Sequence, residues 1–442
     1  MNENQSLFAL IVYQAKKGDS LFENIPIPER AIAVGYNRKG FNRKIAEEHL
    51  LELVFLAETA GAEVVETFFQ EVERIHPGTA IGKGKVEEIQ FYIEMNDIQL
   101  VIFDDDLSPV QAKNLENAFT VKVIDRSWLI LDIFALRAQS VEAKTQVELA
   151  QLKYLQPRLT RMWTHLSKQY GGIGTKGPGE TQIETDRRII KTRIQKLEKK
   201  LQHIEIQRKQ QRKGRDKLPR FALVGYTNAG KSTLMNVLTD SGVYTEDKLF
   251  ATLDTTIRTF TLPEGNTALI SDTVGFIRKL PAHLIASFRS TLAEVSEADI
   301  LVHVLDISNS FVEEQYQVVK ETLKELGVKD KPTILVLNKS DIIEDRSDLI
   351  YFGNKYKNSI LISAKRSINI LALLEEFKQE IENMSNLFDI LLPYSESALL
   401  SKLYAVTTIS ERNDTDDGYV FKVSVNNDKK ELFNSFFKKY IV

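Results

Sequence analysis

Short apolar runs alternate with amphipathic stretches along the first part of the chain. Residues 31–36 and 101–103 predict buried strands, whereas residues 45–59 carry apolar side chains at helical spacing. Ser108-Pro109 predicts the start of a further helix, because serine caps a helix N-terminus and proline fits its first turn. This order of strands and helices predicts a small N-terminal α/β domain over residues 1–125.

A second alternating pattern fills residues 218–384. Five apolar runs predict buried strands, at residues 221–224, 268–271, 300–306, 333–337 and 360–362. The stretches between them have helical spacing, at residues 232–239, 284–295, 313–326 and 370–384. This pattern predicts a doubly wound, mostly parallel sheet with its ligand at the carboxyl ends of the strands, and thus an α/β fold class.

Two long helical stretches and a glycine-rich break lie between these regions. The first runs over residues 128–155 and is expected to end before Pro157. The second begins at Glu180, and its apolar positions from 190 onward alternate three and four apart, which forms a heptad seam. We therefore predict a helical hairpin arm over residues 126–217, in which the second helix packs antiparallel on a partner helix.

The last 58 residues, 385–442, predict a small α+β domain. Residues 388–392 and 419–425 have strand patterns, and residues 395–404 and 429–440 have helical patterns. No candidate catalytic group stands out here. The domain is compatible with contact to a partner and with simple capping of the preceding domain.

Composition excludes several classes of protein. The 442 residues are 43% hydrophobic and 27% charged, as in ordinary globular proteins of two to four domains. There is no cysteine, which excludes disulfides, thiolate metal sites and cysteine nucleophiles. The N-terminus has no basic region before its short apolar run, and no stretch has the length of a membrane span. We expect a soluble, cytoplasmic protein.

The net charge of −3 conceals one strongly basic block. Residues 187–217 hold thirteen lysines and arginines against Glu198, Glu205 and Asp216, an excess of ten positive charges. Solvated coiled-coil faces usually mix both signs, because like charges at i,i+4 repel. The block therefore favours a nucleic-acid partner bound through phosphates over a dimerising coil. The glycine-rich stretch, residues 171–179, is compatible with close approach to RNA and with a hinge.

The stretch from Gly225 to Ser232 reads G-x-x-x-x-G-K-S between a predicted strand and a predicted helix. This context is typical of a phosphate-binding loop, whose amides and helix N-terminus surround the phosphates of a nucleotide. Lys231 is expected to reach the β- and γ-phosphates, and the Ser232 hydroxyl is expected to bind Mg²⁺.

Three further motifs follow in the order typical of GTPases. Asp272-Thr273-Val274-Gly275 follows a strand, so that Asp272 is expected to hold Mg²⁺ through water and the Gly275 amide to contact the γ-phosphate. Asn338-Lys339-Ser340-Asp341 selects the base, because the Asp341 carboxylate accepts hydrogen bonds from two donors that guanine has and adenine lacks. Ser363-Ala364-Lys365 ends the last predicted strand. These motifs predict GTP and GDP as ligands.

For the switch residues the sequence offers more than one candidate. Thr252 is our candidate for the threonine that meets Mg²⁺ and the γ-phosphate, with Thr255 and Thr256 as rivals. Phe276 stands where Ras-like enzymes have the glutamine that orients water, so we predict slow intrinsic hydrolysis and an activating partner, although Phe276 also suits loop packing. Arg278 and Arg289 are the candidates for an arginine finger.

Two local features in the N-terminal domain are weak signals. Residues 81–85 form a basic glycine turn that suits either a phosphate contact or an ordinary surface turn. Asp104, Asp105 and Asp106 are adjacent in sequence, so they do not converge on one metal ion, and we expect a solvated turn.

Several of these segments resemble the HflX family, in the Obg–HflX group of translational GTPases. The similar segments are residues 81–89 (IGKGKVEEI), 123–134 (VIDRSWLILDIF), 146–152 (QVELAQL), 171–187 (GGIGTKGPGETQIETDR), 249–254 (LFATLD) and 272–277 (DTVGFI). The resemblance implies binding to the large ribosomal subunit and a role in splitting or rescuing stalled ribosomes under stress. Where the family has D-P-T-T-R, this chain has Asp254-Thr255-Thr256-Ile257-Arg258, and the missing proline leaves the rigidity of this switch open.

Motifs and resemblance together define the predicted site. Lys231, Thr252 and Gly275 are the predicted catalytic residues, and Ser232, Thr252 and Asp272 the predicted Mg²⁺ ligands. The predicted nucleotide contacts are Gly225, Tyr226, Thr227, Asn228, Ala229, Gly230, Lys231, Ser232, Thr233, Phe250, Ala251, Thr252, Asp272, Thr273, Val274, Gly275, Asn338, Lys339, Asp341, Ser363, Ala364 and Lys365.

The leading hypothesis is a monomeric GTPase that binds the rRNA of the large subunit through the basic helical part of the arm, residues 180–217, and the glycine-rich stretch. A second hypothesis is a nucleotide-controlled switch that acts on a protein partner through the heptad seam, or a large-subunit assembly factor. A third is an RNA-remodelling NTPase that RNA stimulates without ribosomes. Steep salt dependence of binding would distinguish the first from the second.

Overall fold

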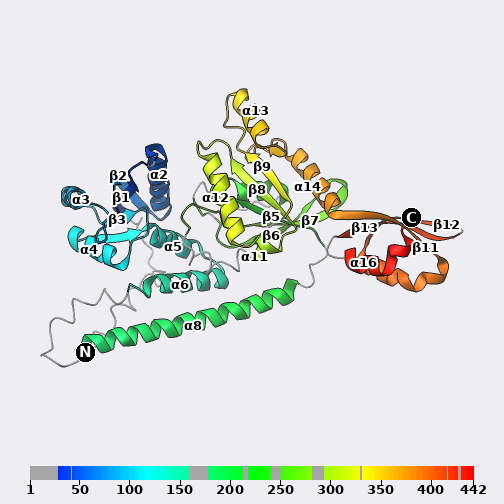
Figure 1. Cartoon of the computed structure of the whole chain (residues 1–442), viewed down its shortest axis with the longest axis horizontal. Coiled ribbons are helices and arrows are strands. Elements are labelled where there is room, and N and C mark those ends of the chain that lie inside the picture. The colour runs from blue at the N-terminus through cyan, green and yellow to red at the C-terminus, as the bar shows by residue number, and fades with distance from the viewer. Residues whose placement is uncertain are drawn as a thin grey trace, which may run out of the picture.

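The computed structural model describes residues 28–40, 42–158, 178–212, 218–239, 249–250, 252–280, 293–328, 331–415, 417–426 and 430–442. Within these ranges the chain forms three β-sheets in succession, and a long helix runs along the lower side of the molecule (Figure 1). None of the helices in these ranges is both long and apolar enough to cross a membrane. Most of the glycine-rich stretch lies outside the described residues, as do Ala251 and Arg289.

The N-terminal domain is a parallel four-stranded sheet with helices on both faces. Its strand order is β2-β1-β3-β4. Core residues of α2 and α5 cover one face, and those of α3 and α4 cover the other. The elements are β1 (Glu29–Arg38), α2 (Arg43–Thr59), β2 (Ala62–Val72), α3 (Lys83–Asn96), β3 (Leu100–Phe103), α4 (Pro109–Phe119), β4 (Lys122–Asp125) and α5 (Arg126–Arg137).

Ser108 caps α4 as the sequence predicts. Its hydroxyl accepts from the Gln111 amide while the Gln111 side chain accepts from the Ser108 amide, which completes a capping box. Pro109 occupies the first turn. The residue pattern alone therefore located this helix start correctly.

The single helix predicted over residues 128–155 is wrong. The structure has two helices, α5 and α6 (Val141–Leu155), separated by residues 138–140. Ala138 is extended, with φ −64° and ψ 117°, and Ser140 caps α6 by accepting from the Ala143 amide. Helical spacing did not reveal the break, because apolar positions continue on both sides of it.

The second arm helix, α8 (Pro178–Arg212), packs along α6, as Figure 1 shows. Leu149 of α6 packs with Ile194 and Leu197 of α8, whereas Gln156, just after α6, shares a cavity with Arg187. Higher numbers on α6 thus meet lower numbers on α8, so the two helices are antiparallel, as predicted. We call α6 and α8 together the arm.

The domain predicted over residues 218–384, which we call the G domain, follows the arm. It contains a six-stranded sheet of order β10-β9-β8-β5-β7-β6, in which only β6 is antiparallel to its neighbour. This arrangement confirms the doubly wound, mostly parallel sheet. Its elements are β5 (Arg220–Gly225), α9 (Lys231–Thr239), β6 (Thr256–Thr261), η1 (Pro263–Gly265), β7 (Thr267–Asp272), α11 (Ala293–Glu297), β8 (Ile300–Asp306), α12 (Val312–Glu325), β9 (Thr333–Asn338), α13 (Arg346–Lys355), β10 (Ser359–Leu361) and α14 (Ile370–Met384).

The C-terminal domain is a three-stranded antiparallel sheet of order β11-β13-β12, with helices packed on its apolar face. Its elements are β11 (Ser385–Leu392), η2 (Tyr394–Leu399), α15 (Leu400–Val406), β12 (Thr408–Thr415), β13 (Gly418–Asn426), α16 (Lys430–Phe437) and η4 (Lys438–Tyr440). The sequence pattern missed β12, as it missed β2, β6 and α13 elsewhere. The predicted domain boundaries after residues 125, 217 and 384 stay predictions.

Candidate functional site

The phosphate-binding loop connects the end of β5 to the start of α9. Neighbouring protein atoms leave no room for a side chain at either of its two glycines. A Cβ on Gly225 (φ +156°) would lie 2.4 Å from the carbonyl oxygen of Val304 on β8, and one on Gly230 (φ +93°) would lie 2.2 Å from Nδ2 of Asn338. The first amides of α9 have no intrahelical acceptor, so they present donors to an anion at the end of the sheet.

Lys231 lies buried beside this loop. Its ammonium donates to the carbonyl oxygens of Gly225, at 3.2 Å, and Tyr226, at 2.8 Å. Burial lowers the pKa of Lys231 to about 8, and the Asp272 carboxylate opposes this shift. A bound phosphate would favour the charged form, so this position suits an anion.

Ser232, Thr252 and Asp272 converge on one point. The Ser232 hydroxyl lies 2.8 Å from that of Thr252 and donates to Oδ2 of Asp272 at 2.5 Å. Thr252 donates to the same carboxylate oxygen at 3.1 Å, while the other oxygen, Oδ1, is buried and has no hydrogen-bond partner within the described part of the chain. Burial raises the pKa of Asp272, and the nearby Lys231 and hydroxyls offset this only in part.

These groups fit a magnesium ion. Mg²⁺ usually takes one or two carboxylates and completes its shell with water and substrate phosphates. Two hydroxyls and one carboxylate, whose Oδ1 has no hydrogen-bond partner among the described residues, supply the protein part of that set. Of the rival threonines, Thr256 begins β6 and pairs with Asp272 through the strand backbone, whereas Thr252 reaches the Asp272 carboxylate with its hydroxyl.

The segment after β7 packs directly on the phosphate-binding loop. The Phe276 amide donates to Gly225 at 3.0 Å, and the Thr227 amide donates to the Phe276 carbonyl at 2.7 Å. A Cβ on Gly275 would lie 2.7 Å from Cα of Thr227 and 3.0 Å from Nζ of Lys231. Only glycine therefore fits at 275. Phe276 itself is 1% exposed, so it packs in the core as well as standing in the glutamine position.

The predicted base-recognition residues meet at the ends of β9 and β10. Asn338 connects two loops, because its Nδ2 donates to the Ala229 carbonyl at 2.9 Å and its Oδ1 accepts from the Ala364 amide at 3.0 Å. Lys339 pairs with Asp306 at 2.7 Å. Asp341 is exposed, which is compatible with the predicted contact to a base that enters from solution.

Other predicted contacts face away from this point. The Thr273 hydroxyl donates to the Leu223 carbonyl on β5, and Val274 is a core residue. Phe250 packs edge-to-face on Phe134 of α5 at 4.8 Å, so its ring is also part of the core. Tyr226 extends its side chain towards α2. Any contact of these four residues with the nucleotide would therefore have to come from their backbone atoms and not from their side chains.

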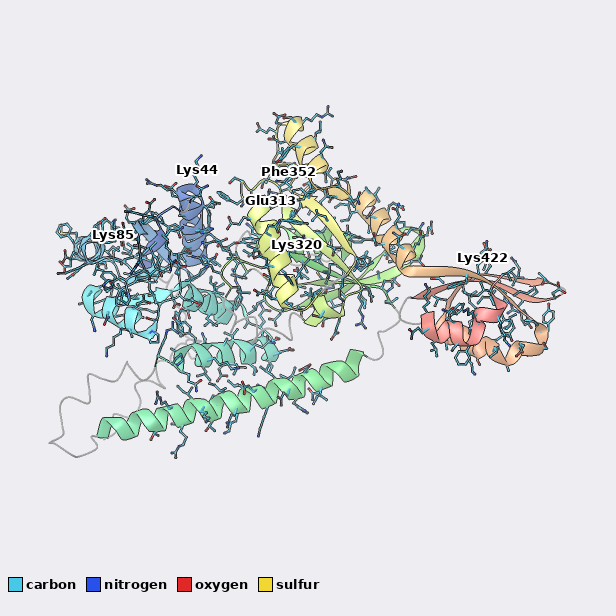
Figure 2. The ribbon with its side chains drawn as sticks, viewed as in Figure 1. Lys44, Lys85, Glu313, Lys320, Phe352 and Lys422 are labelled. Carbon is cyan, nitrogen blue, oxygen red and sulfur yellow. The ribbon has the colours of Figure 1, made fainter. Side chains whose placement is uncertain are left out.

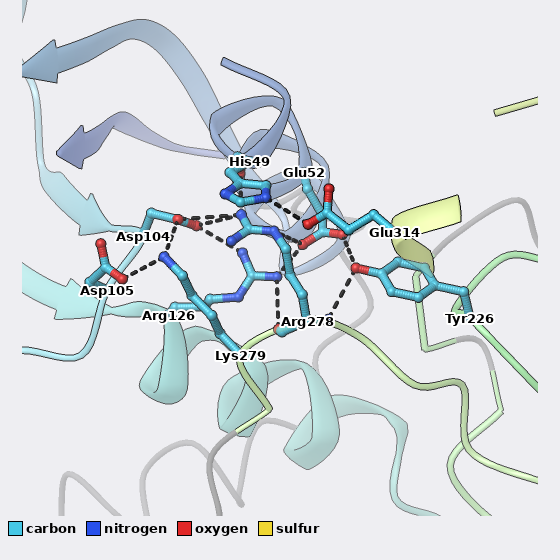
Figure 3. Close-up of polar contacts among 9 residues, drawn as sticks. All are labelled: His49, Glu52, Asp104, Asp105, Arg126, Tyr226, Arg278, Lys279 and Glu314. Carbon is cyan, nitrogen blue, oxygen red and sulfur yellow. Dashed lines mark hydrogen bonds and ion pairs between the residues drawn. The ribbon is translucent and has the colours of Figure 1, made fainter. Parts of the chain in front are cut away.

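An unpredicted cluster of charged and polar side chains, several of them buried, joins the N-terminal domain to the G domain (Figure 3). We call it the interdomain ion cluster; it comprises His49, Glu52, Asp104, Asp105, Arg126, Tyr226, Arg278, Lys279 and Glu314. Arg126, 1% exposed, donates to Asp104 at 2.8 Å and also to Glu52. Arg278, just beyond Phe276, donates to Asp104 at 3.1 Å and to the His49 carbonyl at 2.8 Å.

The cluster corrects two expectations. Asp104 is 4% exposed and paired with three cations, so the solvated turn expected at residues 104–106 is wrong for this residue. Burial raises the pKa of Asp104, but the surrounding cations more than offset this, and the net pKa lies below its usual range. The Arg278 guanidinium, a candidate for an arginine finger, is paired with the carboxylates of Glu52 and Asp104.

Tyr226 connects the phosphate-binding loop to the cluster. Its hydroxyl donates to Glu52 of α2 and accepts from the Arg278 amide at 3.0 Å. Burial raises the pKa of Tyr226, so the hydroxyl keeps its proton. Sequence reasoning missed this contact because the partners are 174 and 52 residues apart. The one local signal was an aromatic residue inside an otherwise small and polar loop.

Comparison with known proteins gives matches along most of the chain. Three family models match consecutive segments, described as GTP-binding GTPase N-terminal (residues 47–135), GTP-binding GTPase Middle Region (137–215) and 50S ribosome-binding GTPase (220–339). GTPase HflX of Caldanaerobacter subterraneus is 44% identical over 98% of this chain and 99% of its own length. GTPase HflX of Escherichia coli is 40% identical over 90% and 94%.

A solved structure of a GTP-binding protein from Sulfolobus solfataricus in complex with GDP is 27% identical, with a TM-score of 0.41, and the match covers 79% of this chain and 98% of that one. The sequence matches span both the glycine-rich stretch and the four nucleotide motifs. The chain therefore belongs to the HflX family of GTPases and is itself a GTP-binding GTPase.

Proposed function

We propose that this GTPase acts as a monomer in the cytoplasm, binds the large ribosomal subunit, and uses Mg²⁺-dependent GTP hydrolysis in splitting or rescuing stalled ribosomes under stress. The observation that supports this most strongly is that the exposed face of α8 in the arm is rich in positive charges. The description of the matching G-domain family, 50S ribosome-binding GTPase, agrees with it.

The arm separates its apolar and basic faces. Ile194 and Leu197 of α8 are buried against α6, whereas the cations around them are exposed. These exposed cations are Arg187, Arg188, Lys191, Arg193, Lys196, Lys199 and Lys200. A basic surface on a helix that is already packed suits a polyanion better than a second helix. The middle of the seam, which a dimerising coil would use, is therefore covered from within the chain.

The site supports hydrolysis by positioning and electrostatics. We propose that Lys231 and the amides of the phosphate-binding loop hold the phosphates, that Ser232, Thr252 and Asp272 hold the magnesium ion, and that the Gly275 amide faces the γ-phosphate. The ion, when bound, neutralises charge that develops on the phosphate oxygens. No covalent intermediate is needed, because water attacks the phosphorus directly.

Slow intrinsic turnover is expected of the isolated chain. Phe276 carries no group that orients water, and the Arg278 guanidinium is held in the interdomain ion cluster. We expect phosphate release well below about 1 s⁻¹ for the chain alone and a large increase when large subunits are added. Phosphate release at or above that rate without ribosomes would contradict the need for a partner.

Binding to large subunits should weaken steeply with salt. We expect the chain to sediment with large subunits and not with small subunits, more strongly with a non-hydrolysable GTP analogue than with GDP. Replacing Lys196, Lys199 and Lys200 with glutamine should reduce the slope of log affinity against log salt by about 2 to 3 units, since each phosphate contact contributes about 0.7 to 0.9.

A matched triple variant controls for net charge. Lys320 of α12 (Figure 2), Lys324 and Lys357 are exposed lysines of the G domain, and their replacement with glutamine should leave the slope unchanged. Equal effects of the two triple variants would show that the arm is not the binding surface.

Two further outcomes would favour the other hypotheses. Stimulation of GTP hydrolysis by free RNA without ribosomes would favour the RNA-remodelling NTPase. Failure to dissociate joined ribosomes, despite binding of large subunits, would favour an assembly factor.

A further inference from the structure

Asp254 stands two residues after Thr252, and its carboxylate points away from the nucleotide site. Oδ2 accepts from the amides of Gln139, at 2.9 Å, and Ser140, at 3.2 Å. The other oxygen, Oδ1, accepts from the Ser140 hydroxyl. All three donors belong to the turn between α5 and α6, so this side chain connects the switch segment to the base of the arm.

The turn needs an acceptor at this place. The start of α6 leaves amides without helical partners, and the positive end of the helix dipole favours a carboxylate. Ser140 supplies one acceptor by capping the Ala143 amide at 3.0 Å. Asp254 accepts from the amides of Gln139 and Ser140, which directly precede α6, and adds a negative charge at the N-terminus of this helix. The interaction is therefore favourable for both partners.

A second contact holds the same segment on the other side of Thr252. The Phe250 ring packs on Phe134 of α5 at 4.8 Å, and its amide donates to the Thr227 hydroxyl at 2.9 Å. Leu253, between Thr252 and Asp254, is 2% exposed in the same core. Thr252 is thus fixed at both ends to α5 and α6, while its own hydroxyl reaches Asp272.

We propose that Asp254 is a positioning residue for GTP hydrolysis. By bonding the α5–α6 turn it places the Thr252 hydroxyl where the magnesium ion and the γ-phosphate require it, which GDP does not need. This inference rests on the proposed role of Thr252. The contact of the Asp254 side chain with the turn also limits the backbone next to Asp254. It therefore replaces the rigidity that a proline at position 255 would have supplied.

The same contact links the site to the arm. α6 packs on α8 through Leu149, and Glu148 of α6 pairs with Arg193 of α8 at 2.6 Å. A partner that moves the arm changes the turn to which Asp254 bonds. Because coupling between two binding sites is reciprocal, GTP changes the affinity for an arm ligand by the same factor by which the arm ligand changes the affinity for GTP.

The test compares Asp254→Ala with Thr252→Ala and a matched control. The control is Asp345→Ala, which removes an aspartate that caps α13 through the Ser347 amide at 2.8 Å. Dissociation constants are measured for GDP and for a non-hydrolysable GTP analogue, each with and without Mg²⁺, together with single-turnover hydrolysis. We expect Asp254→Ala to weaken the Mg²⁺-bound analogue about tenfold, to leave GDP unchanged, and to slow hydrolysis about a hundredfold.

Further variants separate positioning from folding. Ser140→Ala should act in the same direction but less, whereas Ser108→Ala, at the cap of α4, should not affect the nucleotides. The double variant Thr252→Ala/Asp254→Ala should bind the analogue no more weakly than Thr252→Ala alone. Equal losses for GDP and the analogue, or equality with Asp345→Ala, would overturn the proposal.

If Thr252→Ala itself leaves the Mg²⁺-bound analogue unaffected, the assignment of Thr252 fails and the positioning role fails with it. If Thr252→Ala acts and Asp254→Ala does not, the nucleotide site stands and only the positioning role is wrong.

Discussion

Replacing Asp341 with asparagine is expected to weaken GDP binding by at least about a hundredfold. Hydrogen bonds to a charged group contribute about 1.5–3 kcal/mol each, and the carboxylate can accept from both the N1 and N2 donors of guanine. An asparagine amide can accept only one of them, and its NH₂ group would face the other donor. Asp341 is exposed and lies in the turn after β9, so the fold should tolerate the change.

The same variant should gain affinity for xanthosine diphosphate, which has a carbonyl where guanosine diphosphate has the 2-amino group. Titration calorimetry with both ligands measures the reversal, and Asp348→Asn, an exposed aspartate in the first turn of α13, is the control. Unchanged GDP affinity in Asp341→Asn would show that this carboxylate does not contact the base.

Replacing Arg126 with methionine should destabilise the N-terminal domain by about 3 kcal/mol. Breaking a buried ion pair costs about 3–5 kcal/mol, because an uncompensated charge remains in the interior. Arg126 contacts both Asp104 and Glu52. The lower end of the range applies, since Arg278 still pairs with both carboxylates after the change. Methionine preserves the apolar volume of the side chain.

Hydrogen exchange of α2 and α5 measures this effect locally, which avoids assuming two-state unfolding of a multidomain chain. Arg193→Met, which removes a surface pair with Glu148, is the matched control and should cost no more than about 1 kcal/mol. Similar losses of protection in the two variants would mean that the interdomain ion cluster contributes no more than an ordinary surface pair.

Local patterns located most elements because they depend on neighbours in sequence. The cap at Ser108 and the strands β5, β8 and β9 follow from residue spacing and turn chemistry, and the structure confirms them. Short or polar strands such as β6 and β12 were missed, because their pairing partners and not their own apolar content define them. The break between α5 and α6 was missed for a related reason: one of its stabilising acceptors, Asp254, comes from a distant segment.

For the nucleotide site, the sequence by itself determined the ligand class. Glycines at fixed spacing, a lysine, a hydroxyl and an Asn-Lys-x-Asp motif carry their chemistry in their identity, so their order along the chain was enough. Only the tertiary structure decided how the switches connect to the rest of the molecule. Asp254 meets the turn between α5 and α6, and Arg278 meets Asp104, across 115 and 174 residues. Such contacts depend on where buried charges and helix ends find partners in space, which no local pattern encodes.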